Sequence, residues 1–283
     1  MVTDAQRQHF FEQGFLQLRG HFSPDDADIV NRAVERAWSD TSIYNPLTIS
    51  AFTGTPEYTE TYLREAPRGA RDTNYKLNHL YLYDHSTLEL LFSDRVQRLV
   101  GELIDGTPLL FNGLNLEYGS AQRFHNDTLY MPPRAEHKMV VVWLALEDVT
   151  LAAGALRYYP KSHLIPPYVF SHGEIWAIND EMPAFDEYMD AEIAERGLTP
   201  EYFEASKGDV FVWHSQLYHG GSPILDKALT RRSMVAHFWR AEDVPKEWRW
   251  EARPDRFILD PRWMPVATNF ASNGFRQSAA TSA

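Results

Sequence analysis

The sequence predicts a mainly β protein with helices flanking the sheet, and two observations support this prediction. From Pro108 to Trp239, apolar residues run on continuously or alternate in short segments, as they do in buried strands. Long helical periodicity is confined to the part of the chain before Asp105. A chain of 283 residues can form a sizeable core, and we expect one domain over residues 1–283.

The amino-terminal part is expected to hold most of the helices. Residues 3–13 predict a helix that Gly14 ends, and residues 15–18 alternate as a short strand. A Ser-Pro pair at residues 23–24 is typical of a helix start, and this second helix runs to about residue 38. Residues 86–105 repeat leucine and valine at helical spacing and predict one further helix.

Strand patterns dominate the remainder of the chain, and three segments interrupt or follow them. The strands are expected at residues 76–83, 109–116, 139–146, 154–160, 208–213 and 232–239. Residues 40–75 are interpreted as a long loop or lid, and residues 164–205 as an inserted loop with one short helix at 185–196. After residue 241 we expect a tail wrapped over the domain, frayed beyond residue 273.

Composition excludes several classes of function. Hydrophobic residues make up 44% of the chain and charged residues 23%, both ordinary for a globular protein. No stretch approaches the roughly 18 apolar residues of a membrane span, and the first residues lack the apolar core of a signal peptide. The net charge of −12 argues against nucleic-acid and anionic-membrane binding. We therefore expect a cytoplasmic protein, monomer or homodimer, that acts on a small molecule.

The main chemical signal lies at residues 123–128. His125 and Asp127 stand two residues apart, and on a strand such side chains point to the same face. The chain has no cysteine, which leaves His, Asp and Glu as metal ligands. A second histidine from a later strand would complete a 2-His-1-carboxylate triad. That triad holds Fe(II) and leaves its opposite face open for O2 and a co-substrate.

Several histidines are candidates for the third ligand. His219 is favoured because it follows a strand and precedes two glycines, and glycine lets the backbone approach a bound group closely. His214, five residues earlier, is the main competitor and is interpreted as a pocket or core residue. The others are His137, His163, His172 and His237, of which His163 and His237 are interpreted as core histidines.

An arginine at the start of the last strand predicts a second site. Arg231 and Ser233 alternate onto one face of the strand. A buried guanidinium needs an anionic partner, and one carboxylate of a dicarboxylic acid supplies it in bidentate form. Arg232 is the alternative clamp, but its side chain leaves the opposite face, so the shared face with Ser233 favours Arg231.

The order of these motifs resembles the phytanoyl-CoA dioxygenase family of Fe(II)/2-oxoglutarate oxygenases over nearly the whole chain. The resemblance rests on the helix–Gly–strand opening at residues 6–20, His125-Asn126-Asp127, Trp143-Leu144-Ala145-Leu146-Glu147-Asp148, Gly154-Ala155-Leu156, Pro160-Lys161-Ser162-His163, Gly208-Asp209, and His219-Gly220-Gly221-Ser222 followed by Arg231. It implies a double-stranded β-helix, a cupin-like jelly roll of two facing antiparallel sheets.

The resemblance also implies the cofactor and its ligands. Fe(II) would be bound by His125, Asp127 and His219, with 2-oxoglutarate and O2 as co-substrates. Arg231 would hold the far carboxylate of 2-oxoglutarate. The rest of that pocket is expected from Ser233, Trp143, Lys76 and Asn115.

The reaction implied is hydroxylation of an unactivated C–H bond in a mid-sized metabolite, with release of succinate and CO2. Asp127 favours hydroxylation over halogenation, because halogenating relatives need a small residue at that position. Desaturation, epoxidation and cyclisation use the same iron and stay open. The alternative from another class is a non-oxidative jelly-roll protein that binds a metal or ligand. Arg231 with Ser233 argues against it, because a structural metal needs no acid clamp.

Overall fold

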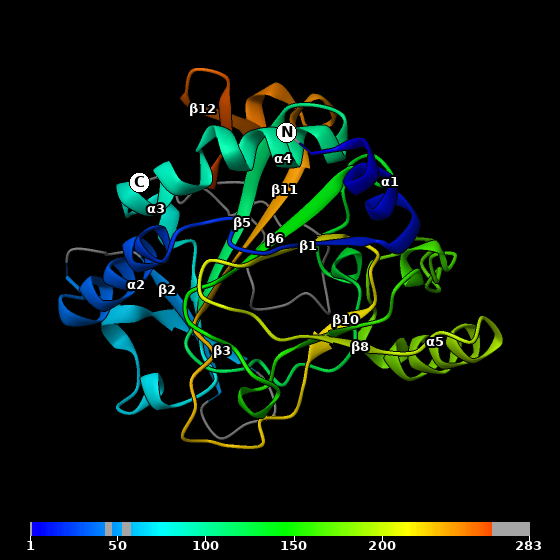
Figure 1. Ribbon diagram of the computed structural model, residues 1–283, viewed down its shortest axis with the longest axis horizontal. Helices are drawn as coiled ribbons and strands as arrows, with labels where there is room; N and C mark the ends of the chain where they lie inside the picture. Colours follow the sequence, from blue (N-terminus) through cyan, green and yellow to red (C-terminus); the bar gives the residue numbers. More distant parts are fainter. Residues whose placement is uncertain (1, 43–46, 53–57, 262–283) are drawn as a thin grey trace.

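A large, mostly antiparallel sheet forms the centre of the protein (Figure 1). The computed structural model describes residues 2–42, 47–52 and 58–261. Within them, the sheet runs in the order β1 (Phe15–Leu18), β9 (Val210–His214), β6 (Met139–Ala145), β11 (Ser233–Arg240), β5 (Pro108–Leu116), β4 (Lys76–Asn78), β2 (Thr48–Phe52) and β3 (Tyr58–Tyr62). A smaller sheet has the order β10 (His219–Gly221), β7 (Leu156–Tyr158) and β8 (Glu201–Phe203). The prediction of a mainly β fold is confirmed.

The register of β11 decides which side chains face the interior between the sheets. β11 lies between β5 and β6, and its residues Ser233, Val235 and His237 share one face. Their partners on that face are Leu116, Leu114 and Asn112 on β5, and Ala145, Trp143 and Val141 on β6. The opposite face of these three strands is covered by helices.

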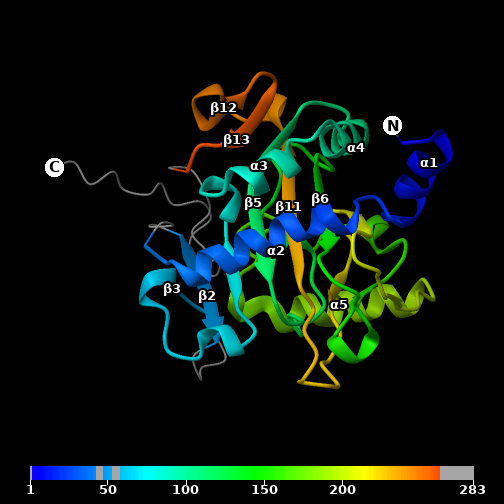
Figure 2. The ribbon, with the colours of Figure 1, turned by 60° about the vertical axis from the view of Figure 1, so that its left-hand side comes forward.

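Five helices accompany the sheets in the described residues: α1 (Asp4–Gln13), α2 (Pro24–Ser39), α3 (His85–Leu91), α4 (Asp94–Ile104) and α5 (Met182–Glu195). Figure 2 shows α2 lying across the strands β5, β11 and β6. Its alanines and valines, from Ala27 to Ala37, are buried against the sheet. Among the residues described, no helix combines the length and apolar character that a membrane crossing requires.

The first two helices begin and end where their capping residues predict. Thr3 and Ser23 each occupy an N-cap and accept a hydrogen bond from the third helical residue, in capping boxes with Gln6 and Asp26. Gly14 ends α1 in the left-handed conformation, at φ +88°. A Cβ at Gly14 would lie 2.5 Å from the ring of His163, so the position also requires glycine for space.

The interpretation of residues 40–75 as a loop or lid is wrong for the part that the structure describes. It contains strands β2 and β3 and two short 3-10 turns, Leu63–Glu65 and Ala70–Asp72. Ile49 and Ala51 of β2 are buried against Leu77 and the inner face of α2. The strand pattern is weak in the sequence because β3 lies at the edge of the sheet and needs few apolar residues.

Three other segments differ from the prediction. Residues 86–105 form two helices, α3 and α4, with a break at Phe92 and Ser93. Residues 76–83 hold only the short strand β4, followed by a 3-10 turn. The inserted segment 164–205 contains the expected helix, as α5, and also the strand β8.

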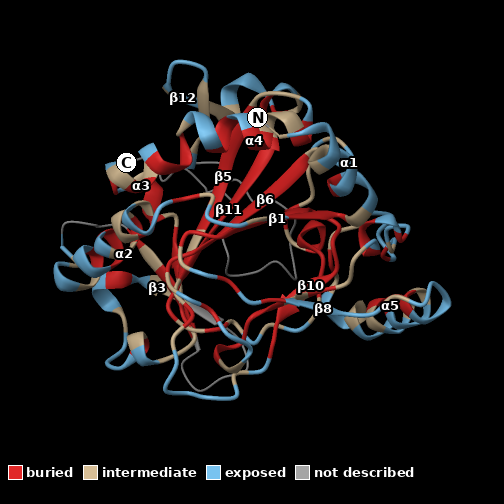
Figure 3. Cartoon of the chain, viewed as in Figure 1, coloured by how far each residue is buried: buried red, intermediate tan, exposed pale blue. Residues whose placement is uncertain are grey.

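The tail after residue 241 is more ordered than expected. Strands β12 (Arg249–Arg253) and β13 (Arg256–Leu259) form a hairpin, and β13 pairs in parallel with β5. The predicted fraying beyond residue 273 lies outside the described residues. Figure 3 shows that the buried residues concentrate in the long central strands, while α5 and the turns at the rim are largely exposed.

Candidate metal centre

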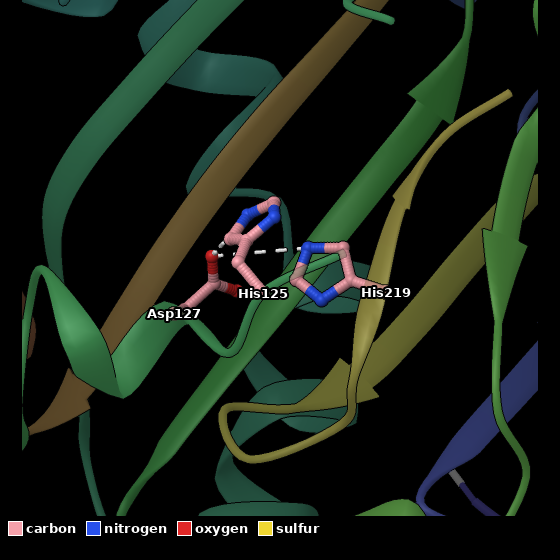
Figure 4. Close-up of side chains that lie close together, drawn as sticks. All are labelled: His125, Asp127 and His219. Carbon is pink, nitrogen blue, oxygen red and sulfur yellow. Dashed lines mark ion pairs between the residues drawn. The ribbon is translucent and has the colours of Figure 1, made fainter. Parts of the chain in front are cut away.

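Three buried side chains converge between the two sheets. His125, Asp127 and His219 each offer one ligand atom, and these atoms lie within 4.8 Å of one another. Oδ1 of Asp127 is 3.7 Å from Nε2 of His125 and 3.8 Å from Nε2 of His219 (Figure 4). The structure therefore brings together the three residues that the sequence predicts as ligands.

His125 and Asp127 do not lie together on one regular strand, the arrangement in which a spacing of two residues would align them. His125 makes an isolated antiparallel bridge to His219, with backbone hydrogen bonds of 2.8 and 3.0 Å. Asp127 opens the 3-10 turn Asp127–Leu129, and its N–H donates to the carbonyl of Ser215. The bridge, rather than the spacing of two residues on one strand, aligns the two imidazoles.

Hydrogen bonds from outside the centre orient each ligand. Nδ1 of His125 lies 2.9 Å from the carbonyl of Arg123, and Nδ1 of His219 lies 2.9 Å from the carbonyl of Leu217. Each Nδ1–H can donate there, which leaves the Nε2 lone pairs directed at the centre. Asp127 accepts from the indole N–H of Trp213 at 2.8 Å through Oδ2, which leaves Oδ1 for a metal. This arrangement is the one that ligands of a divalent transition metal need.

Burial and charge favour the ligand-competent protonation states. Burial lowers the pKa of His125 to about 3, and the neighbouring His219 adds to this effect. Burial alone raises the pKa of Asp127, but the three nearby histidines His219, His237 and His125 outweigh it and lower the pKa below its ordinary value. A neutral imidazole and an ionised carboxylate are the forms that bind a metal.

His214 belongs to a different cluster. His214 pairs with Val140 of β6, and its side chain leaves β9 on the face opposite to that of Trp213, which faces the metal centre. Nδ1 of His214 accepts from the N–H of Gln216, and its Nε2 lies 3.2 Å from Nδ1 of His137. The ring of His163 lies beside it, 5.3 Å away between centroids. His214 and His163 thus lie on the opposite face of β9 from the triad.

His237 is buried, as the sequence analysis expects, but it faces the metal centre rather than the apolar core. Its Nε2 lies 4.0 Å from Oδ1 of Asp127, and the side chain is 3% exposed. The sequence signal for this position is the alternation that runs from Arg231 through Ser233 and Val235 to His237.

The candidate acid clamp lies at the start of β11. Arg231 is 2% exposed, and its Nη1 donates to the carbonyl of Gly154 at 3.0 Å. Near it, the hydroxyls of Ser233 and Ser222 and the indole N–H of Trp143 are buried without a hydrogen-bond partner. Buried polar groups are normally paired, so this set of groups fits a polar ligand.

The side chain of Arg232 extends from the face of the chain opposite to that of Arg231, at the start of β11. Its guanidinium meets Glu117 at 3.0 Å and Glu35 at 3.2 Å. Asn115, which the sequence analysis places in the co-substrate pocket, also lies on this outer face. It pairs with Met234 and Leu77, and Leu77 packs against α2. The structure therefore does not bring Asn115 together with the other predicted pocket residues.

Lys76 lies on the inner side, close to the triad. Its Nζ is 3.5 Å from Oε1 of Gln122, and the amide of Gln122 lies 3.3 Å from Nε2 of His125. Burial lowers the pKa of Lys76 to about 8, and the negative charge of Asp127 opposes this shift. A positive charge is therefore held beside the centre.

The fold and the three converging side chains together indicate a class: a jelly-roll protein with a possible 2-His-1-carboxylate metal site, the donor set of non-heme iron oxygenases. The chain belongs to the phytanoyl-CoA dioxygenase (PhyH) family, whose family model matches residues 10–233. This confirms the resemblance noted in the sequence. The chain has no significant match among proteins of curated function.

Solved structures with a similar fold include two enzymes from nogalamycin biosynthesis and EctD from S. alaskensis. The carbocyclase SnoK from nogalamycin biosynthesis is 14% identical, with a TM-score of 0.64 and 85% of each chain covered. The epimerase SnoN in complex with Fe3+, alpha ketoglutarate and nogalamycin RO is 18% identical, with a TM-score of 0.64, covering 89% of this chain and 96% of that one.

The third is EctD from S. alaskensis with 2-oxoglutarate and 5-hydroxyectoine. It is 14% identical, with a TM-score of 0.62, covering 86% of this chain and 77% of that one. At these identities the likeness concerns the fold, and it confirms the double-stranded β-helix.

Proposed function

We propose that this protein is an Fe(II)- and 2-oxoglutarate-dependent dioxygenase that hydroxylates an unactivated C–H bond of a mid-sized metabolite. The observation that carries the proposal is the buried cluster of His125, Asp127 and His219, whose free ligand atoms face one point. Membership of the PhyH family supports Fe/2-oxoglutarate oxygenase chemistry. Succinate and CO2 are the expected co-products.

The donor set fits iron. Two neutral imidazoles and one carboxylate on one side leave the opposite positions for a co-substrate and O2. When bound, Fe(II) with 2-oxoglutarate and O2 supplies the oxidising power for C–H cleavage. The protein positions the reactants and excludes water from a site whose ligands are nearly fully buried.

The pocket residues fit 2-oxoglutarate, a diacid. We assign the far carboxylate to Arg231, with Ser233 and the indole of Trp143 as further donors. Their hydroxyl and indole groups are buried without partners, as groups that await a ligand would be. Lys76 supplies positive charge beside the metal. We omit Asn115 from this pocket because its side chain extends from the outer face of β5, away from the pocket.

Hydroxylation is our choice among the reactions that this iron centre supports. The ligand at position 127 is a carboxylate rather than a small residue, which disfavours halogenation. The structural neighbours include a carbocyclase and an epimerase as well as EctD with bound 5-hydroxyectoine. Desaturation, epoxidation and cyclisation are therefore the alternatives within the same chemistry. A non-oxidative metal- or ligand-binding protein is the alternative from another class.

A direct test is succinate formation by the purified protein with Fe(II), 2-oxoglutarate and O2. The wild type should form succinate, and Asp127→Ala should not. Losing an outer hydrogen bond to a metal ligand typically costs about 10- to 100-fold in metal affinity, and losing the only anionic ligand should cost more. Asp180→Ala, which removes an exposed carboxylate far along the inserted segment, is the matched control. Equal succinate formation by Asp127→Ala and the wild type would remove the triad from the proposal.

A further inference from the structure

The imidazole of His237 lies beside the carboxylate of Asp127 and therefore close to the proposed iron site. Its Nε2 is 4.0 Å from Oδ1 of Asp127, similar to the 3.7 and 3.8 Å separations of the two histidine ligands. It is not part of the compact group of three ligand atoms. His237 is therefore placed to contact a group bound at the iron rather than the iron itself.

Asn112 fixes which nitrogen of His237 carries the hydrogen. The amide Nδ2 of Asn112 lies 3.2 Å from Nδ1 of His237 and 3.3 Å from the sulfur of Met131. A thioether sulfur only accepts hydrogen bonds, so the NH2 group of Asn112 faces both neighbours. Nδ1 of His237 is then the acceptor, and Nε2 carries the hydrogen that points toward the metal centre.

The position of His237 along β11 separates it from the acid clamp. Ser233 and His237 face the same side and are four residues apart, or roughly 13 Å along an extended strand. His237 cannot reach a carboxylate that Arg231 and Ser233 hold. It faces the other end of the co-substrate, the end that chelates the metal.

The charge near His237 indicates an anionic partner. The buried Lys76 is close enough to influence the pKa of both His237 and His125. An ammonium group and an imidazole N–H on one side of the centre suit a carboxylate better than a neutral group. Among the described residues, the acid that contacts His237 is Asp127, which is itself a proposed ligand.

We propose that His237 is a further co-substrate-binding residue, which donates from Nε2 to the metal-proximal carboxylate of 2-oxoglutarate, and that Asn112 is its positioning residue. The inference rests on the proposed function and adds to it a second anchoring point. The two carboxylates of the diacid are then bound by different residues on or next to β11, the far one by Arg231 and the metal-proximal one by His237.

The test measures anaerobic binding of Fe(II) and of 2-oxoglutarate to His237→Phe and His237→Gln. The probe is the visible charge-transfer absorbance of the Fe(II)–2-oxoglutarate complex. His237→Phe keeps an aromatic ring but removes the donor, so the Kd for 2-oxoglutarate should rise roughly 10- to 100-fold, as expected for a hydrogen bond to a charged group. His237→Gln restores a donor and should recover most of the affinity. Fe(II) affinity, measured by equilibrium dialysis, should change much less.

A shorter 2-oxo acid distinguishes binding of the metal-proximal carboxylate from binding of the far carboxylate. 2-Oxobutyrate has the metal-proximal carboxylate but lacks the far one. His237→Phe should weaken 2-oxobutyrate and 2-oxoglutarate by similar factors, whereas Arg231→Ala should weaken only 2-oxoglutarate. His214→Phe alters a histidine that is equally buried but lies on the other face of β9, and it should change neither affinity.

The outcomes separate the inference from the proposed function. If the wild type binds neither Fe(II) nor 2-oxoglutarate, the proposed function fails and the inference with it. If the wild type binds both and His237→Phe binds them equally well, only the role of His237 is overturned. A loss for 2-oxoglutarate without a loss for 2-oxobutyrate would also overturn it, because His237 would then act on the far end. Asn112→Leu should show a smaller loss in the same pattern.

Discussion

At the scale of single residues, the ligands are defined as much by their outer hydrogen bonds as by their spacing. Each of His125, His219 and Asp127 uses one polar atom on a partner outside the centre and turns the other inward. His214 is equally buried, but its partners Gln216 and His137 direct it elsewhere. Outer partners therefore distinguish ligands from structural histidines in this chain.

This distinction predicts different iron binding for two histidine variants. His219→Ala removes an Nε2 that faces the centre, so Fe(II) binding should be lost under conditions that saturate the wild type. His214→Ala removes a ring on the far face of β9 and should retain iron binding. Anaerobic Fe(II) titration of both variants decides the matter. The reverse result would move the third ligand to His214.

The two adjacent arginines should also differ. Truncation of Arg231 leaves one carboxylate of 2-oxoglutarate unpaired in a buried site, and such a loss costs about 2–5 kcal/mol, or roughly 30-fold to several-thousand-fold in affinity. Arg232→Ala should leave 2-oxoglutarate affinity nearly unchanged, because its guanidinium pairs with Glu117 and Glu35 on the outer face. Anaerobic 2-oxoglutarate titration at saturating Fe(II) compares them. If neither variant weakens binding, the assignment of 2-oxoglutarate itself fails.

Local sequence patterns predict the role of some of these residues and not of others, for physical reasons. His125 and Asp127 form a local pattern, and the glycines after His219 mark a close approach of the backbone. The roles of Trp213 and His237 depend on which strands pair and in what register, which no local pattern contains. The face of Asn115 is likewise decided by its pairing with β4 and β11, which the local sequence does not reveal.

At the scale of elements, local chemistry predicts boundaries well where a cap is present. The ends of α1 and α2 follow from Thr3, Gly14, Ser23 and Pro24. The break between α3 and α4 leaves no signal in the sequence pattern, because both helices bury apolar residues against the same core and the apolar period continues across the break. Short edge strands such as β3 are difficult to predict from the sequence, because their contacts are made by the backbone.

Glu117, just after β5, links several elements on the outer face. Its carboxylate accepts from Arg71 at 2.8 and 2.9 Å and from the hydroxyl of Tyr75 at 2.6 Å, and it pairs with Arg232 at 3.0 Å. Its backbone carbonyl accepts from the N–H of Arg231 at 2.7 Å. Glu117 thus fixes the start of β11, which carries the candidate clamp.

Glu117→Gln keeps the shape of the side chain and removes its charge. Arg71 and Arg232 then face a neutral amide, and the free energy of unfolding should fall by about 2–3 kcal/mol, less than for a fully buried pair because both arginines are partly exposed. Urea unfolding measures this change. The control Glu89→Gln alters a half-exposed carboxylate that pairs with Arg253 and should cost less than about 1 kcal/mol. Equal effects of the two variants would contradict the linking role of Glu117.

At the scale of the whole molecule, the fold brings distant segments to one point. Residues 76, 125 and 219 lie far apart in sequence, and the order of strands in the two sheets places them around one centre. Strand order is a long-range property, so periodicity alone predicts a mainly β chain but not its topology. The ordered series of motifs, read as a family resemblance, supplied the jelly roll that the structure confirms.

Two buried aspartates, Asp84 and Asp209, connect helices and turns through hydrogen bonds and ion pairs. Their protonation should lower the free energy of unfolding of the whole protein at acidic pH. Asp84 caps α3 by accepting from Thr87 and also binds Ser86 and Arg36 of α2. Burial alone raises the pKa of Asp84, but these bonds outweigh it and lower the pKa from 3.8 to about 2. Asp209 accepts from Arg19 and from the N–H groups of Gly20 and Ser206, and its pKa is likewise lowered.

Both carboxylates release their protons more readily in the folded than in the unfolded chain. Their stabilisation is therefore complete above the unfolded pKa of 3.8 and is lost as the pH falls toward the folded value, about 2 for Asp84. Each should contribute about 1–2 kcal/mol at neutral pH, since Arg36 and Arg19 are half exposed and solvent screens them. The variant Asp84→Asn with Asp209→Asn should be less stable at neutral pH and lose less stability on acidification. Urea unfolding at steps between about pH 5 and about pH 3 compares the slopes. The control is the double variant Asp25→Asn with Asp180→Asn, which changes two exposed aspartates. If Asp84→Asn with Asp209→Asn loses stability on acidification as steeply as the wild type, other groups govern acid unfolding.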